Sequence, residues 1–301
     1  MFRSLIRAAI LTGEVGGEPF RSQLFNSPVR RASACASARE VLSGIGKGSI
    51  DLQKDEQSGI ASIIINQPAK KNAISGRMMV DLRDIVTELE NWKSGQGLLM
   101  YGVGDSFCSG GDLDLMKTLI ENDHGVLMCQ YMQETLQRLQ SLPLLSAALV
   151  HGSSLGGGSE LFTACDFRVV SERVSIGFVQ AKMGLITGWG GGTRLIQLVG
   201  RQSALTLLST AKVLSWREAI DIGLADAVIH DTEPEEFVMH GKQWLLKHLQ
   251  GAPEVCRAVK SMVIFVANAQ EVDKSLEEER KIFGSVFGQA AHIKALNSAK
   301  R

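Results

Sequence analysis

Two glycine clusters in the middle of the chain could do chemistry. They are Cys108-Ser109-Gly110-Gly111-Asp112-Leu113 and Leu155-Gly156-Gly157-Gly158-Ser159-Glu160-Leu161. Each follows an apolar run that predicts a strand, Leu98 to Val103 and Leu144 to Val150, and each precedes a helix-like segment. The first N–H groups of a helix have no partner within it, and glycine lets another atom approach them closely. Two such groups facing one cavity would stabilise a carbonyl oxygen that becomes negative.

The cysteines point to a reduced compartment rather than to catalysis or metal binding. The five cysteines are scattered without a CxxC pair, which is typical of free thiols in an intracellular protein. Cys108 adjoins the first glycine cluster, but no histidine accompanies it in that segment, so we expect it to pack as a small side chain. We expect no zinc or other metal site and no redox cofactor.

The overall composition is that of a soluble globular protein. The chain has 301 residues, of which 45% are hydrophobic, so it can bury a sizeable core. Basic and acidic residues each total 32, which gives a net charge of zero and predicts no general affinity for nucleic acid. No stretch approaches the ~18 to 20 apolar residues of a membrane span, so no membrane association is expected.

The N-terminal segment, residues 1–47, differs from the rest. Arginines are interspersed with serines there and acidic residues are few, as in a mitochondrial transit peptide, although Glu14 and Glu18 are atypical of one. The other interpretation is a disordered tail without a targeting function.

From Gly48 onward the pattern predicts an α/β core over residues 48–232 and a helical region over 233–301. Ile60 to Asn66 predicts a strand, and Ser75 is placed to cap a helix that ends near Trp92. Further short strands are predicted at Phe167 to Val170 and Val174 to Phe178, and a third glycine cluster, Gly188 to Thr193, predicts a close backbone crossing before a helix from Arg194 to Leu198. Three helices follow, Pro234 to Leu249, Pro253 to Ala267 and Val272 to Phe287.

These motifs resemble, in order and spacing, those of the crotonase (enoyl-CoA hydratase/isomerase) superfamily. The resemblance covers about Gly48 to Arg301 and is carried by five segments: Asn66-Gln67-Pro68 with Lys71-Asn72-Ala73, then Phe107 to Leu113, Leu155 to Glu160, Ala164-Cys165-Asp166, and Gly190 to Leu195. It implies a superhelix of ββα turns, a C-terminal helical region that builds homotrimers or dimers of trimers, and an acyl-CoA thioester as the ligand. No further cofactor is implied, because CoA is part of the substrate.

The resemblance also implies roles for individual residues. The oxyanion donors would be the N–H groups of Gly111 and Gly157, and Lys70 or Lys71 would lie near the CoA phosphates. The substrate site would further include Ala73, Gly110 and Trp189, with Trp189 as an apolar wall. The lysines have a second interpretation, a solvated surface pair.

One departure from the family pattern bears on the reaction. Hydratases of this family are expected to use two carboxylates, and this chain has Glu160 at the first position but Gln180 at the second. An amide is no base near neutral pH, and general acid–base help is worth roughly 10²- to 10⁴-fold, so hydration is disfavoured. Decarboxylation of a malonyl-type CoA thioester, such as ethylmalonyl-CoA, needs no base, since the leaving carboxylate supplies the electron pair.

The sequence predicts that Glu160 returns a proton to the substrate and that Gln180 donates to the departing carboxylate. Glu160 has the alternative role of holding its turn by accepting backbone N–H groups, and Gln180 could mark a lost activity. We interpret Asp112 as a helix cap and His151 as structural. Two other functions stay open, an enoyl-CoA hydratase or isomerase and an inactive acyl-CoA-binding protein. The family resemblance favours the cytosol, whereas the N-terminal composition favours the mitochondrial matrix.

Overall fold

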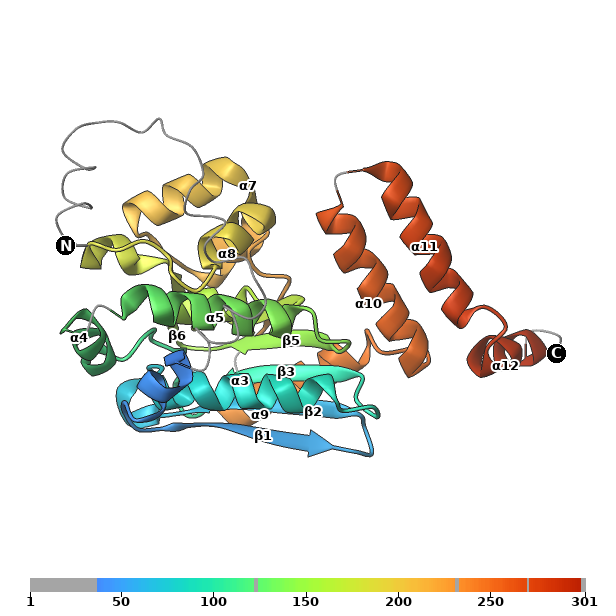
Figure 1. Ribbon diagram of the computed structural model, residues 1–301, viewed down its shortest axis with the longest axis horizontal. Coiled ribbons are helices and arrows are strands. Elements are labelled where there is room, and N and C mark those ends of the chain that lie inside the picture. Colours follow the sequence, from blue (N-terminus) through green and yellow to red (C-terminus); the bar gives the residue numbers. More distant parts are fainter. Residues whose placement is uncertain (1–36, 122–123, 231–232, 270, 299–301) are drawn as a thin grey trace.

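Two sheets and a set of covering helices make up the body of the protein. The computed structural model describes residues 37–121, 124–230, 233–269 and 271–298 (Figure 1). The predicted α/β class is confirmed, as are the strand over Ile60–Asn66 and the capped helix that follows it. The two interpretations of the N-terminal segment concern residues that lie outside the described part, apart from the end of the segment.

A six-stranded sheet runs through the body in the order β1-β2-β3-β5-β7-β10. Only β1 is antiparallel to its neighbour, and the remaining pairs are parallel. Its strands are Ser49–Asp55 (β1), Ile60–Asn66 (β2), Gly97–Gly102 (β3), Leu145–Val150 (β5), Phe167–Ser171 (β7) and Ala227–Ile229 (β10). Alternate residues of these strands are buried on opposite faces, so both faces of the sheet are covered.

A second, smaller sheet of four short strands carries the glycine turns. Its order is β4-β6-β8-β9, and the strands are Ser106–Cys108 (β4), Ser153–Leu155 (β6), Ser175–Gly177 (β8) and Val213–Leu214 (β9). The predicted strands before the glycine turns are present as β3 and β5, but the chain then crosses into this second sheet before each turn. Gly152 permits one crossing because its φ is +56° and a Cβ there would lie 1.8 Å from the carbonyl oxygen of Asp105.

Helices enclose the sheets. Helix α3 (Gly76–Glu90) begins where the Ser75 hydroxyl accepts the N–H of Met78, and Met78 and Met79 are fully buried. The other helices of the body are η1 (Pro68–Lys70), α4 (Leu113–Glu121), α5 (Gly125–Gln140), α6 (Gly157–Phe162), η2 (Val179–Met183), α7 (Gly191–Thr210) and α8 (Trp216–Asp221).

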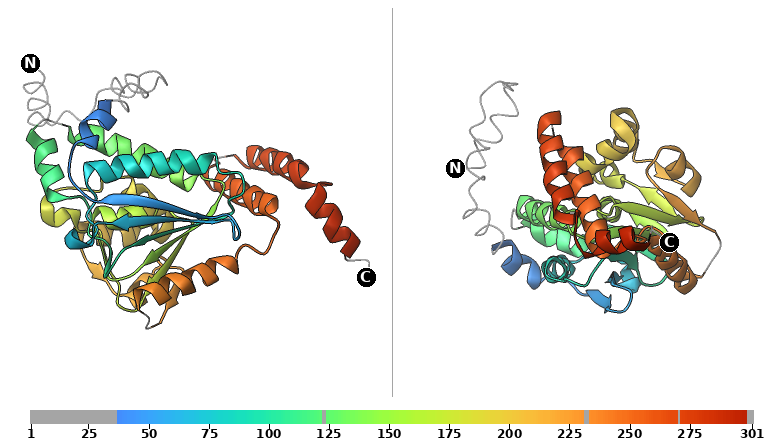
Figure 2. Two further views of the ribbon diagram at one scale, coloured as in Figure 1. Left: turned by 90° about the horizontal axis from the view of Figure 1, so that it is seen from below. Right: turned by 90° about the vertical axis from the view of Figure 1, so that its right-hand side faces the viewer.

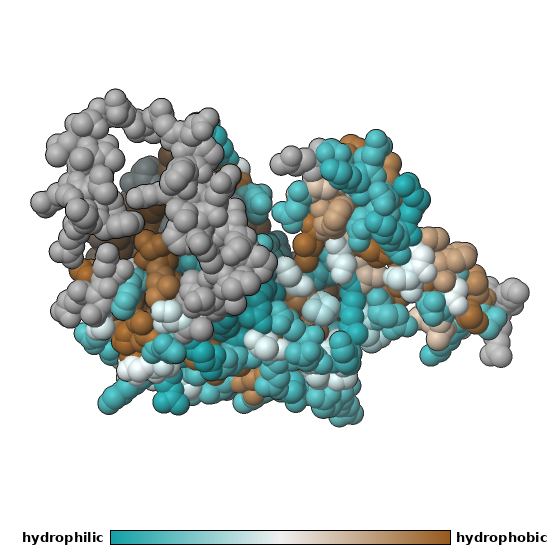
Figure 3. Space-filling view, viewed as in Figure 1, coloured by the Kyte–Doolittle hydropathy of each residue, from teal (hydrophilic) through white to brown (hydrophobic). Residues whose placement is uncertain are grey.

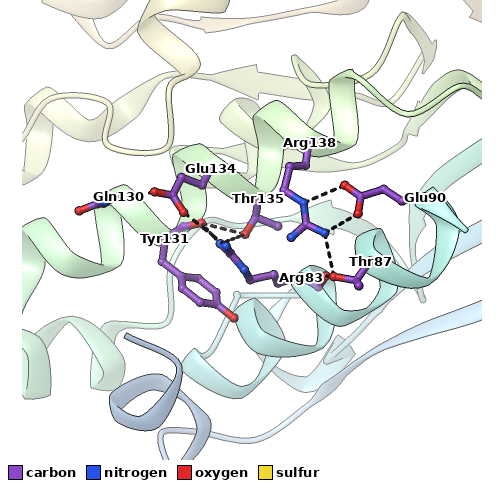
Figure 4. Close-up of polar contacts among 8 residues, drawn as sticks. All are labelled: Arg83, Thr87, Glu90, Gln130, Tyr131, Glu134, Thr135 and Arg138. Carbon is purple, nitrogen blue, oxygen red and sulfur yellow. Dashed lines mark hydrogen bonds and ion pairs between the residues drawn. The ribbon is translucent and has the colours of Figure 1, made fainter. Parts of the chain in front are cut away.

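Polar side chains join α3 to α5 (Figure 4). Arg138 binds both carboxylate oxygens of Glu90, at 2.8 and 2.7 Å, and Arg83 lies over the ring of Tyr131 and contacts Glu134. Two-point arginine–carboxylate contacts fix orientation as well as distance. They hold α5, whose first turns reach the functional site, in register on α3.

The predicted C-terminal helices are present, and a fourth follows them. They are α9 (Pro234–Leu246), α10 (Pro253–Asn268), α11 (Val272–Val286) and α12 (Ala290–Ser298). Helix α9 covers the large sheet, whereas α10, α11 and α12 extend from the body as an arm (Figures 1 and 2). The arm is anchored by Lys260, whose Nζ binds the carbonyl oxygen of Leu144 at 2.6 Å and the carboxylate of Asp166 at 2.8 Å.

Some residues before the expected boundary at residue 47 belong to the body. Residues 37–43 are helical, and Ala38 and Leu42 are each 1% exposed within the core. This part of the N-terminal segment therefore packs on the body because its apolar side chains face α3. In the described residues, no helix has the length and apolar character needed to cross a membrane.

Candidate functional site

The two glycine turns touch through their main chains. A Cβ on Gly110 would lie 3.3 Å from the backbone nitrogen of Gly157, and a Cβ on Gly158 would lie 2.0 Å from the carbonyl oxygen of Cys108. Atoms never approach a real Cβ as closely as the second distance, so a side chain at residue 158 would force the turns apart. The glycines thus let the ends of β4 and β6 meet.

The two predicted N–H donors are both unpaired within the described part of the chain. Ile74 pairs with the two neighbours of Gly111: its N–H donates to the carbonyl oxygen of Gly110, and its carbonyl oxygen accepts the N–H of Asp112. In such a strand-like pairing the N–H of the residue between them, Gly111, faces away from Ile74. Gly157 is the first residue of α6, where a helical N–H has no partner within the helix. No acceptor among the described residues takes either N–H.

Trp189 forms the apolar wall beside both donors. A Cβ on Gly157 would lie 2.5 Å from Cζ3 of its indole, and one on Gly111 would lie 3.6 Å from Cζ2. The ring is 3% exposed, and its Nε1 donates to Sδ of Met128 on α5 at 3.1 Å. Met116 of α4 also adjoins the first donor, because its Cε would lie 2.4 Å from a Cβ on Gly111.

Glu160 lies directly behind this wall and is 2% exposed. Its Oε2 accepts the N–H groups of Trp189 and Gly191 at 2.7 and 2.8 Å. Its Oε1 accepts from Gly188 at 3.2 Å and from Nε2 of Gln180 at 2.9 Å. The carboxylate thus receives four hydrogen bonds and ties the Trp189 loop to α6.

Burial raises the pKa of the Glu160 carboxyl, and the donors around it oppose the rise. The backbone N–H groups stabilise the ionised form that the loop-holding role needs. The structure brings Glu160 and Gln180 into direct contact through a hydrogen bond. The role of Glu160 as a proton donor stays a prediction.

The third glycine cluster makes this contact possible. Gly190 has φ +80°, and a Cβ on Gly191 would lie 2.3 Å from Cγ of Glu160. The cluster thus brings the main chain close to the Glu160 side chain rather than to another backbone, and helix α7 begins at Gly191, earlier than the predicted Arg194. Glycine is needed here because the Glu160 side chain occupies the space that a side chain at residue 191 would take.

A buried arginine that the sequence reasoning did not assign completes the loop. Arg194 donates through Nη2 to the carbonyl oxygens of Glu160 and Trp189 at 3.0 and 2.9 Å, and through Nε to the hydroxyl of Thr163 at 3.0 Å. The available signal was a charged residue in the otherwise apolar start of a helix, inside a motif already singled out.

The two predicted CoA-contacting lysines differ in their surroundings. Lys70 binds Asp112 at 2.7 Å and Asp114 at 3.0 Å, whereas Lys71 is exposed in a left-handed backbone conformation with φ +51°. Asp112 also caps α4, accepting the N–H of Asp114 at 2.9 Å, as predicted. Ala73, the remaining predicted contact, is 8% exposed next to this turn.

Two other residues have the structural surroundings that were expected of them. Cys108 is fully buried, and burial raises the pKa of its thiol to about 12, which disfavours the thiolate that a nucleophile needs. His151 is 6% exposed, with its Nε2 2.7 Å from the carbonyl oxygen of Gly104. Burial lowers the pKa of its imidazole, which is consistent with a neutral ring in the core.

Touching glycine turns with free N–H groups, a buried glutamate behind them and a projecting helical arm define a class of protein. Residues 55–299 match the family model described as enoyl-CoA hydratase/isomerase, so the chain belongs to that family. The predicted crotonase-like fold is confirmed.

Particular relatives are close in sequence. The chain is 44% identical over 261 residues to ethylmalonyl-CoA decarboxylase of Xenopus tropicalis, which covers 87% of this chain and 86% of that protein. It is 42% identical over 251 residues to ethylmalonyl-CoA decarboxylase of Homo sapiens, covering 83% and 80%. The family resemblance found in the motifs therefore extends over most of the chain.

Solved structures agree on the fold. Enoyl-CoA hydratase from Bacillus anthracis superposes with a TM-score of 0.75 at 24% identity, covering 83% of this chain and 95% of that one. Enoyl-CoA hydratase from Mycobacterium smegmatis gives 0.76 at 19% identity over 83% and 95%. At this identity the likeness defines the architecture alone.

Proposed function

We propose that this protein decarboxylates ethylmalonyl-CoA to butyryl-CoA, with methylmalonyl-CoA as a second candidate substrate, and so acts in metabolite repair. The observation that carries the proposal is the pair of unpaired N–H groups, Gly111 and Gly157, on turns that touch. Relatives that are more than 40% identical over most of the chain bear the name of that activity.

The reaction follows from what these two groups can bind. They donate to the thioester carbonyl oxygen of the substrate. The bond between the α-carbon and the carboxylate then breaks, carbon dioxide leaves, and the electron pair forms an enolate whose negative oxygen remains between the two N–H groups. One oxyanion donor is typically worth about 2.7 to 4 kcal/mol of barrier.

The wall of Trp189 and Met116 supports the first step. Hydration stabilises the carboxylate of the substrate, so transfer of this group from water to an apolar setting favours its loss as carbon dioxide. A fixed wall also holds the breaking bond perpendicular to the thioester plane. Gln180 has a second N–H on its Nε2, besides the one that Glu160 accepts, with which it can donate to the departing carboxylate.

The last step is proton delivery to the α-carbon. Glu160 is a carboxyl group on the helix that begins at the second turn, and we propose that it supplies this proton directly or through water. Its buried setting, which raises its pKa, favours the protonated form that a donor needs. The four donors around it favour the ionised form, so this assignment requires its own test.

Hydration of enoyl-CoA is a second candidate because Glu160 occupies the position of one of the two carboxylates that hydratases are expected to use. The residue beside it is the amide of Gln180, so no second carboxylate adjoins it there. An inactive acyl-CoA-binding protein is the third candidate, since the amide of Gln180 cannot act as a base.

Purified protein mixed separately with malonyl-, methylmalonyl-, ethylmalonyl- and crotonyl-CoA distinguishes the three by mass spectrometry. We expect butyryl-CoA and carbon dioxide from ethylmalonyl-CoA over many turnovers. No butyryl-CoA in a single turnover would reject the proposal, and hydroxybutyryl-CoA from crotonyl-CoA would favour the hydratase instead. Tight binding without any product would favour the inactive binder.

We also propose a homotrimer or a dimer of trimers in the cytosol. Apolar side chains are exposed along the arm (Figure 3), among them Val263, Phe265, Leu276 and Phe283. Such a surface favours burial against other subunits. Light scattering after size exclusion measures the subunit number, and a monomer at micromolar concentration would reject the assembly. Imaging of the full chain tests the compartment.

A further inference from the structure

Arg194 is a buried cation without a carboxylate partner among the described residues. It is 7% exposed, and its three acceptors are the carbonyl oxygens of Glu160 and Trp189 and the hydroxyl of Thr163. Burial of a charge costs free energy unless hydrogen bonds compensate for it. Burial lowers the pKa of this guanidinium to about 10, so it is still charged at neutral pH.

Glu160 and Arg194 bind opposite polar groups of one loop. The Glu160 carboxylate accepts N–H groups of the loop, among them that of Trp189. The Arg194 guanidinium donates to the carbonyl oxygen of the same tryptophan. Both peptide groups of Trp189 are therefore held by charged side chains, which form shorter and stronger hydrogen bonds than neutral groups do.

Arg194 also binds helix α6, to which the Trp189 loop is attached through Glu160. The carbonyl oxygen of Glu160 accepts from Nη2 of Arg194 at 3.0 Å and from the hydroxyl of Thr163 at 2.7 Å. This carbonyl belongs to α6, the helix whose first N–H is the donor of Gly157. One guanidinium thus connects the helix that carries a donor to the loop that carries the wall.

We propose that Arg194 is a positioning residue for the reaction: it sets where the Trp189 indole lies against the two N–H donors. The catalytic part of this inference rests on the proposed decarboxylation. A shift of about 1 Å in a positioning contact can cost about 10²-fold in rate. Without the arginine, the carbonyl oxygens of Glu160 and Trp189 lose their common donor and the indole can move from Gly157.

The first test compares Arg194→Lys with Arg168→Lys. Arg168 is the control because it is also buried, at 5% exposed, and donates to the carbonyl oxygens of Leu224 and Cys165, with no contact to Trp189 among the described residues. Unlike Arg194, it also pairs with the carboxylate of Asp226. We expect Arg194→Lys to lower kcat for ethylmalonyl-CoA by about 10²-fold with a change in KM below about threefold. Arg168→Lys should lower the melting temperature and leave kcat within about twofold.

The second readout does not depend on activity. In protein labelled with ¹⁵N-tryptophan, the indole N–H resonance of Trp189, assigned with Trp189→Phe, reports the position of the ring next to Met128. We expect this resonance to move or broaden in Arg194→Lys and to stay in place in Arg168→Lys. Thr163→Val removes one of the three acceptors of Arg194 and also the hydroxyl that donates to the carbonyl oxygen of Glu160, but it keeps the arginine on the two carbonyl oxygens. It should give a smaller shift and a kcat loss between about twofold and tenfold.

The inference is overturned if folded Arg194→Lys keeps the wild-type indole resonance and a kcat within about twofold. It is also overturned if Arg168→Lys shows the same selective loss of kcat. Should Arg194→Lys fail to fold, the Thr163→Val resonance and kcat decide in the same way. A wild-type protein without decarboxylase activity would reject the proposed function, while the resonance would still test the position of the ring.

Discussion

Nη2 of Arg194 lies 3.0 Å from the carbonyl oxygen of Glu160, although the side-chain charges of these two residues form no ion pair in the described structure. Each charge is instead satisfied by the main chain of the loop around Trp189. The N–H and the carbonyl group of Trp189 are thus both paired while its ring is buried against the glycine turns. The loop beside the two N–H donors is consequently held by two charged side chains that bind its main chain.

Removal of one oxyanion donor should reduce turnover without unfolding the protein. Gly111→Pro deletes an N–H that has no partner in the described structure, so no structural hydrogen bond is lost. We expect kcat for ethylmalonyl-CoA to fall by about 10²- to 10³-fold. Steady-state kinetics together with a melting curve measure both effects.

Gly111→Ala is the matched control for that variant. It also adds a Cβ, which would press on the flexible end of Met116, but it keeps the N–H. Its kcat should therefore lie well above that of Gly111→Pro. Equal losses in the two variants would show that crowding, and not the missing donor, lowers the rate.

The pH dependence of kcat should distinguish the two roles of Glu160. A proton donor must be protonated, so activity is present below the pKa of this group and is lost as the pH rises through it. Burial raises that pKa above the ordinary value of 4.5, which places the loss on the alkaline side of that value. Glu160→Gln should lack this limb of the profile.

The same variant tests the loop-holding role. An amide in place of the carboxylate presents an N–H group to a site that already contains four donors, and an unsatisfied buried donor costs about 1 to 3 kcal/mol. We expect the free energy of unfolding to fall by about that amount. A stable variant with an unchanged pH profile would contradict both roles.

Gln180→Glu should disfavour decarboxylation. The new carboxylate would lie next to Glu160, where the amide nitrogen is now 2.9 Å from Oε1, and two adjacent carboxylates raise the pKa of one of them. It would also repel the substrate carboxylate, so we expect at least about a tenfold higher KM for ethylmalonyl-CoA. Gln180→Met, which adds no charge, should affect KM less, and the reverse order would contradict this explanation.

Loss of the arm's anchor should destabilise the protein more than it changes the site. Lys260 is 4% exposed, and Lys260→Met leaves the largely buried carboxylate of Asp166 without its ion-pair partner. Loss of one partner of a buried ion pair typically lowers the free energy of unfolding by about 3 to 5 kcal/mol. Chemical denaturation should show this loss. Lys281→Met, which removes exposed ion pairs on α11, should leave stability nearly unchanged, and equal losses would show that the anchor is not special.

Local patterns were enough for several elements. The β-branched run from Ile60 to Asn66 has a strong preference for extended backbone, and Ser75 offers its hydroxyl to the first turn of a helix, so both were predictable from neighbouring residues. The end of the N-terminal segment was less predictable. Burial of Ala38 and Leu42 depends on a surface provided by a helix further along the chain.

The sequence by itself determined the family, the two glycine turns and the presence of Glu160 and Gln180, because short-range spacing carries these features. Only the tertiary structure decided that each turn leaves a strand of a second sheet, and that Arg194 and Glu160 hold one loop between them. Those relationships join residues that are far apart in the chain, and their direction depends on how main-chain N–H and carbonyl groups are paired. Residue types alone do not encode that pairing.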